Sequence, residues 1–369
     1  MIRKSHVFEW PSSKFQKNLL EWYDRYRRDL PWRARKGHKS DPYHVWMSEV
    51  MLQQTTVPAV KSYFDKFTAL WPTVKHLASA PEDHVLKEWA GLGYYARARN
   101  LYKCARAITA EYGGVFPDTE EELIKLPGIG PYSAAAITSI AYNKQATVVD
   151  GNVERIVARL SALEEPLPQA KKAIKELAKH LYEDIGKRAA DMPQALMDLG
   201  AMICTPKSPS CGLCPVSAYC TARKSGTQEN YPLKAEKVKK PTRTGVVYWL
   251  QTTSGEVLVE KRSTERMLGG MMAFPGSNWD NYTGESFNRD LTIENIKNWE
   301  QCGQIKHVFT HFTLILDVRK ARVSKKNLIL NNNQRLVGIK DIGDLGFPSL
   351  YKKVSNMVLT FDSSGNRNE

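Results

Sequence analysis

The spacing of apolar residues is helical through the first part of the chain. Between residue 1 and about residue 225, apolar positions recur three and four residues apart, which is typical of amphipathic helices. Predicted helices in this part include residues 15–28, 43–54 and 153–163. We therefore expect a mostly α-helical region over residues 1–225.

Beyond this region the pattern becomes that of β-strands. Residues 246–250 and 257–261 flank a turn at Ser254-Gly255, which predicts a β-hairpin. Further elements are expected at 311–318 and 328–330 (strands) and at 291–300 and 348–358 (helices). Residues 226–244, rich in lysine, proline and polar side chains, predict an interdomain linker. A small α+β domain is thus expected over residues 245–369.

Two glycine turns each lead into a predicted helix. Gly128 and Gly130 flank Ile129, and Pro131 then suits the first helical turn, because its missing N–H costs nothing there. Such a helix start presents free backbone N–H groups, so it can bind a phosphate without a lysine. The second turn, residues 91–97, adds two tyrosines that either insert into a base stack or belong to the core. The two turns together favour a nucleic-acid partner.

Glu49 and Asp150 are the two carboxyl groups that suggest chemistry. In the predicted helix 43–54, Glu49 shares a face with Val45, Trp46 and Leu52, which would raise its pKa and suit a general acid. The alternative is an ordinary surface glutamate. Asp150 directly precedes the predicted helix 153–163, where an aspartate is a preferred N-cap, so it acts as a cap, as a reacting carboxylate, or as both.

Four clustered cysteines follow the long helical region. Cys204, Cys211, Cys214 and Cys220 give the spacing C-x6-C-x2-C-x5-C. In a chain without a secretory signal, such a cluster more often binds metal than forms disulfides. Zinc ribbons usually have two C-x2-C pairs and here there is one, so the spacing favours a [4Fe–4S] cluster over zinc.

Net charge and hydropathy limit the class of protein. The formal net charge is +14 and the pI is about 9.4, which fits either a solvated basic surface or a polyanion partner. No apolar run is long enough to cross a membrane, and the N-terminus has neither signal nor transit-peptide character. We therefore expect a cytoplasmic protein with no membrane contact.

The motifs in combination resemble a known family. LPGIGPYSA, VVDGN and the cysteine spacing resemble the helix-hairpin-helix DNA glycosylases that carry an iron–sulfur cluster. PWR at 31–33, SEVMLQQT at 48–55, GLGYYARARN at 91–100 and the added α+β domain look like the MutY-type adenine DNA glycosylase family. The resemblance covers nearly the whole chain. It implies a multidomain protein in which a helical glycosylase core with the cluster, at 204–220, is followed by a nudix-like domain.

This resemblance implies base-excision repair of adenine mispaired with 8-oxoguanine or guanine. It assigns the leaving-group proton to Glu49 and stabilisation of the sugar cation to Asp150, with Asn152 and Tyr132 orienting Asp150 and the attacking water. Asn152 could equally be the helix cap. Endonuclease III has a lysine where this chain has Tyr132, so we expect a monofunctional glycosylase with weak or no strand cleavage.

The resemblance also implies contacts with double-stranded DNA that contains an adenine:8-oxoguanine mispair. The residues concerned are Arg33, Leu52, Gln54, Tyr94, Gly128 and Gly130 in the helical region, and Phe309, Thr310 and His311 in the last domain. Relatives have Phe-Ser-His where this chain has Phe309-Thr310-His311, so the loop keeps a hydroxyl and gains a methyl. The last domain lacks the paired glutamates of a nudix hydrolase, so we expect it to read the lesion without hydrolase activity.

Three other functions remain open from sequence. They are a non-catalytic mismatch-binding protein, a nucleotide pyrophosphatase acting through the last domain, and an endonuclease III-like glycosylase with lyase activity. The presence of both Glu49 and Asp150 counts against the first, the missing glutamates count against the second, and Tyr132 counts against the third. We expect a monomer that other repair proteins assist.

Overall fold

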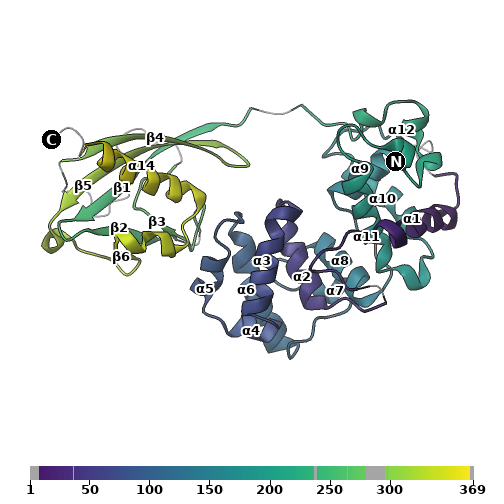
Figure 1. Cartoon of the computed structure of the whole chain (residues 1–369), viewed down its shortest axis with the longest axis horizontal. Helices are drawn as coiled ribbons and strands as arrows, with labels where there is room; N and C mark the ends of the chain where they lie inside the picture. Colours follow the sequence, from purple (N-terminus) through teal and green to yellow (C-terminus); the bar gives the residue numbers. More distant parts are fainter. Residues whose placement is uncertain are drawn as a thin grey trace. The chain divides into compact units, whose positions relative to one another are not determined.

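The computed structural model describes residues 8–35, 37–236, 239–263, 265–279, 296 and 298–365. The chain divides into two compact units (Figure 1). The first comprises Met1–Ser79 and Asn100–Lys237, and the second comprises Ala80–Arg99 and Val238–Glu369. The predicted domains were continuous in sequence, whereas residues 80–99 here group with the second unit. Among the residues described, no helix has the length and apolar character needed to cross a bilayer.

The first unit is helical. Its helices are α1 (Ser12–Tyr26), α2 (Pro42–Leu52), α3 (Val57–Leu70), α4 (Val74–Ser79), most of α6 (Ala96–Glu111), α7 (Glu120–Leu123), α8 (Pro131–Tyr142), α9 (Gly151–Ser161), α10 (Lys171–Tyr182), α11 (Asp191–Met202) and α12 (Thr221–Lys224). Short 3₁₀ turns η2 (Gly186–Arg188), η3 (Cys211–Leu213), η4 (Ser217–Tyr219) and η5 (Gln228–Asn230) connect the later ones. The predicted helices 15–28, 43–54 and 153–163 correspond to α1, α2 and α9, with ends that differ by one to three residues.

Helix α8 lies at the centre of this unit. Every residue from Ser133 to Ala141 is buried, and α8 packs against both α2 and α11. Its alanines and serines are small, so neighbouring helices approach its backbone closely, and the alanines also have high helix propensity. This packing fixes the start of α8 next to the middle of α2.

The second unit contains a six-stranded mixed sheet. Its strands are β1 (Thr242–Thr252), β2 (Glu256–Lys261), β3 (Met272–Ala273), β4 (Glu300–Val308), β5 (Thr313–Val323) and β6 (Gln334–Gly338). The order is β3-β2-β1-β5-β4, and β6 pairs with β2. Only β1 and β5 are parallel among these pairs, from Thr242 opposite Thr313 to Thr252 opposite Val323. The unit also contains α5 (Glu82–Glu88), η6 (Lys325–Asn327), η7 (Ile339–Leu345) and α14 (Ser349–Gly365).

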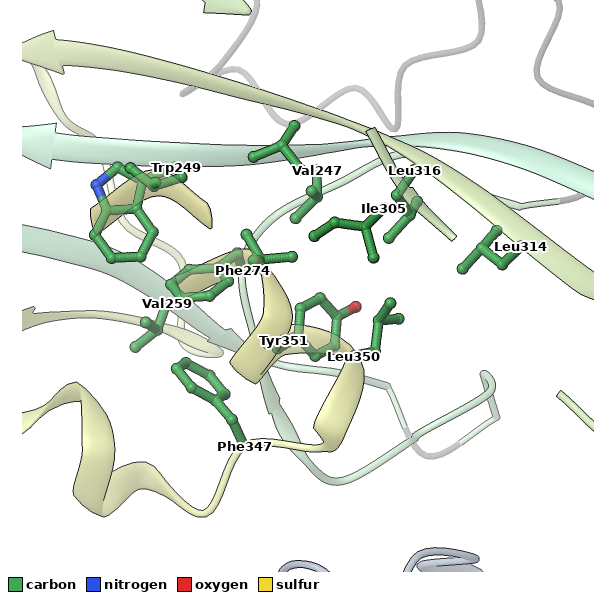
Figure 2. Close-up of a cluster of buried hydrophobic side chains, with 14 of the residues drawn as sticks. Val247, Trp249, Val259, Phe274, Ile305, Leu314, Leu316, Phe347, Leu350 and Tyr351 are labelled. Carbon is green, nitrogen blue, oxygen red and sulfur yellow. The ribbon is translucent and has the colours of Figure 1, made fainter. Parts of the chain in front are cut away.

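One face of this sheet packs against α14. Figure 2 shows Val247, Trp249, Leu314 and Leu316 of β1 and β5 turned toward Leu350 and Tyr351 of α14. Ladder neighbours in the sheet place side chains on the same face at alternate positions. These side chains therefore form a continuous apolar layer beneath the helix.

Several predictions for this domain are confirmed and others are wrong. The hairpin around Ser254-Gly255 is confirmed, with Gly255 at φ +86°, and so is the helix at 348–358. Strand β1 begins three residues inside the predicted linker 226–244, and β5 begins two residues later than predicted. The strand at 328–330 is wrong, because those residues are not in a strand. In the helix predicted at 291–300, residues 291–295 and 297 lie outside the described residues and Glu300 starts β4 instead.

Candidate active site

Glu49 is buried in the middle of α2. The helix starts with Asp41 accepting a hydrogen bond from the Tyr43 N–H, and Pro42 occupies the first helical position. From this start, helical periodicity turns Glu49 inward, where only 7% of its surface is exposed. Burial, with a smaller contribution from nearby Asp150, raises the pKa of Glu49 to about 7 against the opposing effects of Tyr132 and Arg33. Part of the Glu49 population is therefore protonated at neutral pH.

The first turn of α8 brings Tyr132 to Glu49. The Tyr132 hydroxyl donates a hydrogen bond to Glu49 Oε2 at 2.6 Å. Burial and the carboxylates of Glu49 and Asp150 keep the pKa of Tyr132 well above its usual value, so the phenol remains a donor. Since Oε2 accepts this bond, Oε1 is left as the oxygen that carries the acidic proton.

The glycine turn before Tyr132 is left open at its surface. Gly128 adopts φ +77°, and both Gly128 and Gly130 are exposed. Gly130 is the N-cap of α8 and no side chain caps the helix start. No side chain thus occupies this helix start, and phosphate binding by its backbone N–H groups stays a prediction.

Asp150 is held at the start of α9 by its own helix. Its Oδ1 accepts from the N–H groups of Asn152 at 3.0 Å and Val153 at 2.8 Å, and its Oδ2 accepts from Asn152 Nδ2 at 2.8 Å. Asp150 is thus the cap, and Asn152 is its second donor instead of the cap itself. Tyr132 bonds Glu49 and not Asp150, so of the two predicted orienting residues only Asn152 contacts Asp150 directly.

Arg155 connects this carboxylate to the cysteine loop. Its Nη2 donates to Asn152 Oδ1 at 2.9 Å and to the Gly200 carbonyl at 2.7 Å, and its Nε donates to the Cys204 carbonyl at 2.8 Å. The side chain of Asn152 is therefore fixed on both sides. Sequence reasoning did not identify Arg155, although its place three residues after Asn152 on α9 was a usable signal.

A small pocket opens beside Glu49. It has a volume of about 50 Å³, and its lining includes Trp32, Leu52, Met197, Arg28 and Gln194. Three of these are mainly apolar and two offer N–H donors, so the pocket combines apolar contacts with a few hydrogen-bonding groups. Leu52 thus lines the pocket, whereas Gln54 is exposed with φ +57° just beyond the helix.

Arg33 is paired with a buried carboxylate, and its predicted contact with DNA stays a prediction. Its Nη1 and Nη2 donate to the two oxygens of Asp198 at 2.7 Å each. Asp198 is fully buried and also accepts from the main chain and Nε of Arg28. The guanidinium of Arg33 is used in neutralising this carboxylate. No sequence motif marks Asp198, Arg28 or Gln194, so only their contacts in the structure reveal them.

The four cysteines lie in one loop between α11 and α12. Cys211 is the first residue of η3. Two of the other cysteines contact Arg159 of α9. The Arg159 Nη1 donates to Cys204 Sγ at 3.2 Å, and the Arg159 carbonyl accepts from Cys220 Sγ at 3.3 Å. Burial and the other three cysteines raise the pKa of the Cys214 thiol to about 12, while the Val216 N–H opposes the rise. The four thiols are therefore close enough to interact electrostatically. Among the described residues, no group of three or more His, Cys, Asp or Glu side chains is arranged so that it could hold a metal ion. A buried arginine and backbone N–H groups aimed at sulfur fit thiolates that carry negative charge.

The remaining predicted contacts belong to the second unit. Tyr94 is 49% exposed and left-handed at φ +48°, while Tyr95 is buried. Thr310 and His311 are exposed at the β4–β5 turn, with Phe309 half-buried beneath them. The hydroxyls of Tyr94 and Thr310 lie 3.1 Å apart. One exposed patch of this unit therefore contains both predicted contacts.

Arg97 acts within the glycine turn. Its Nη2 donates to the carbonyls of Leu92 and Gly93, and its guanidinium lies over the rings of Trp89 and Tyr94. Burial lowers the pKa of Arg97 to about 10, which still leaves it charged at neutral pH. Arg97 therefore supports the glycine turn from inside.

Comparison with known families agrees with this arrangement. Residues 47–183 match the HhH-GPD superfamily of base excision DNA repair proteins. Residues 204–220 match the iron–sulfur binding domain of endonuclease III, and residues 246–357 match the NUDIX domain. The chain therefore has a helix-hairpin-helix core with an iron–sulfur binding loop, followed by a nudix-like domain.

Individual relatives cover most of the chain. It is 30% identical to the adenine DNA glycosylase of Buchnera aphidicola subsp. Baizongia pistaciae over 95% of this chain and 98% of the relative. It is 34% identical to the adenine DNA glycosylase of Homo sapiens over 82% of this chain, and spans 66% of that longer relative. Among solved structures, a thermostable thymine-DNA glycosylase is 31% identical with a TM-score of 0.51, covering 58% of this chain and 97% of that one. The chain belongs to the adenine DNA glycosylase family of DNA repair enzymes.

Proposed function

We propose that this enzyme removes adenine that faces 8-oxoguanine in duplex DNA by hydrolysing the N-glycosidic bond. The observation that carries the proposal is Glu49, a buried carboxyl with a pKa of about 7 at the edge of a pocket, electrostatically coupled to Asp150. Two carboxyl groups with opposite environments are the arrangement by which glycosidases separate the acid from the charge-stabilising group.

The reaction first requires the transfer of a proton from Glu49 to the adenine base. A target adenine lies inside the duplex and must be extruded at a cost of a few kcal/mol. In the pocket, the protonated oxygen of Glu49 would donate to a ring nitrogen of adenine, so that the base leaves as a neutral molecule. The Tyr132 hydroxyl holds the other oxygen and so sets the direction of the donated proton.

The departing base leaves a sugar cation that Asp150 would stabilise or attack. Three hydrogen bonds from Asn152 and Val153 fix the orientation of the carboxylate. Fixed dipoles and charges stabilise a developing charge without having to reorganise during the reaction. Tyr132 cannot form a Schiff base with the sugar, which supports a monofunctional glycosylase.

The cysteine loop would hold a [4Fe–4S] cluster through Cys204, Cys211, Cys214 and Cys220. Bound there, the cluster would supply covalent cross-links that hold the loop between α11 and α12 in one shape. The donor set supports this choice, since four thiols with N–H donors and a buried arginine suit a thiolate-bound cluster.

Recognition of the base opposite adenine is assigned to the exposed patch of the second unit. Tyr94 would insert into the base stack, and Thr310 and His311 would contact 8-oxoguanine. The Thr310 hydroxyl both donates and accepts hydrogen bonds. The phosphate backbone would bind at the open start of α8.

Replacement of Asp150 by asparagine tests the chemistry. Asp150→Asn should lower single-turnover adenine release by on the order of 10²–10³-fold or more, because an amide cannot stabilise the cation. Duplex affinity should change by a few-fold at most. The assay measures alkali-cleavable sites formed in an adenine:8-oxoguanine duplex, and strand breaks without alkali report lyase activity.

Glu154→Gln is the matched control, since Glu154 is also an acid in the first turn of α9 and pairs with Lys171. It should retain wild-type turnover. Turnover near the wild-type rate in Asp150→Asn would remove Asp150 from the mechanism.

A further inference from the structure

The β4–β5 turn is a tight hairpin whose tip consists of two residues. Val308 pairs with Thr313, and the Phe309 N–H donates to the Phe312 carbonyl at 2.9 Å. Thr310 and His311 form the exposed tip between them. The position of both side chains is therefore set by what holds Phe309 and Phe312.

Aromatic rings support the tip from below. The ring of Phe309 lies 4.9 Å from that of Phe312, 5.7 Å from that of Trp279 and 4.7 Å from that of His307. Burial lowers the pKa of His307, and Lys353 adds to this, so the imidazole is neutral and packs as an apolar ring. Flat rings in contact leave Phe309 few alternative orientations.

A short segment that leads into β1 fixes the same turn from the side. Lys240 Nζ donates to the Phe309 carbonyl at 3.0 Å, and the Thr313 N–H donates to the Pro241 carbonyl at 2.9 Å. The Arg243 guanidinium lies over the Phe312 ring, 4.4 Å from its centroid. Two cations thus hold the two residues that close the hairpin, one through a carbonyl and the other through a ring.

We propose that Lys240 and Arg243 are positioning residues that determine specificity, because they hold the Phe309–Phe312 turn in the shape that presents Thr310 and His311 to the base opposite adenine. This inference rests on the proposed reading role of that tip. A recognition loop that is already ordered before binding loses less conformational entropy when it meets its ligand. The lower entropic cost should affect only recognition of the base opposite adenine, since the proposed function places adenine itself in the pocket of the first unit.

The test compares the full-length protein with Lys240→Ala, Arg243→Ala and Arg243→Lys. Single-turnover adenine release is measured on adenine:8-oxoguanine and adenine:guanine duplexes. Each alanine variant should lower the ratio of the two rates by about three- to tenfold, with the adenine:guanine rate within about twofold of wild type. Arg243→Lys should retain part of the ratio, because it keeps the charge and loses the planar stack.

Lys340→Ala is the charge-matched control, since Lys340 is an exposed cation of the same unit in η7. It should leave the ratio unchanged. If both substrates slow equally and the salt dependence of binding weakens, Lys240 and Arg243 are phosphate contacts and the inference is overturned. Equal thermal unfolding of Arg243→Lys and wild type shows that a changed ratio does not come from unfolding.

The double substitution of Thr310 and His311 by glycine separates this inference from the function on which it rests. An unchanged ratio in that variant overturns the reading role itself. A reduced ratio there, together with wild-type ratios in Lys240→Ala and Arg243→Ala, overturns only the positioning role.

Discussion

Glu49 keeps its proton at a pH where an exposed glutamate has lost it. Burial raises the pKa of Glu49 from 4.5 in the unfolded chain to about 7 in the folded protein. Between pH 4.5 and about pH 7 the folded protein therefore binds more protons than the unfolded chain, and its free energy of unfolding falls as the pH rises. The contribution of this carboxyl to stability is therefore fully present below about pH 4.5 and is lost as the pH rises through about 7. The raised pKa of Glu49 thus makes the folded protein less stable in the alkaline range.

Glu49→Gln should separate activity from stability. The amide cannot donate the proton, so adenine release should fall at every pH. The variant should be more stable than wild type at pH 8 by about 2–3 kcal/mol, with a much smaller difference at pH 5. Urea unfolding at both pH values measures this, with exposed Glu21→Gln as the control. A stability difference that is the same at both pH values would contradict the raised pKa.

Single residues differ in how far the sequence revealed them. The apolar neighbours of Glu49 within one turn of the same helix indicated a buried acid, with a surface glutamate left open as the alternative. The bond from Tyr132 could not be predicted, because the two residues are 83 positions apart in sequence. The pairing of Arg33 with Asp198 could not be predicted for the same reason, since the two are 165 positions apart. Local spacing predicts which way a side chain faces, but not which distant group it meets.

At the scale of elements, the turn before α8 depends on one glycine. Gly128 has φ +77°, and a Cβ added there would lie 2.6 Å from Asn100 Cβ. Gly128→Ala should therefore lower the free energy of unfolding by about 1–2 kcal/mol and weaken duplex binding, because the open N–H groups would shift. Chemical denaturation and duplex titration at two salt concentrations measure the two effects.

Gly151→Ala is the matched control for this turn. A Cβ on Gly151 meets nothing within 4 Å, and the residue is helical, so its stability should be unchanged or slightly higher. Equal stability of the two alanine variants would show that the left-handed turn is not under steric constraint.

The helices were easier to predict than the sheet. Helices α1, α2 and α9 followed from periodicity within one segment, whereas the pairing of β6 with β2 joins residues far apart in sequence. Leu328, Ile329 and Leu330 suggested a strand because they are three consecutive apolar residues. Leu328 packs against the sheet, whereas Ile329 is 78% exposed and Leu330 is 39% exposed, and none of the three is in a strand. An apolar run predicts a strand only when another strand is present to pair with it.

At the scale of the whole molecule, the proposed function assigns a separate task to each of the two units. The pocket and both carboxyl groups belong to the first unit, and the Thr310-His311 tip belongs to the second. A chain that ends at residue 236 should lose the preference for 8-oxoguanine over guanine opposite adenine by about tenfold or more, while adenine:guanine turnover falls less. Single-turnover rates on both duplexes give the preference. An intact preference in the shortened protein would refute the reading role.

The start of α8 joins two tasks within a few residues. Gly130, which caps the open anion site, is two positions from Tyr132, which orients the acid. The distance between the anion site at Gly130 and the tyrosine that holds Glu49 is consequently set by the covalent geometry of one short peptide. It does not depend on movements of the larger helices relative to one another. A phosphate bound at this helix start would therefore lie at a fixed distance along the chain from the residue that orients Glu49.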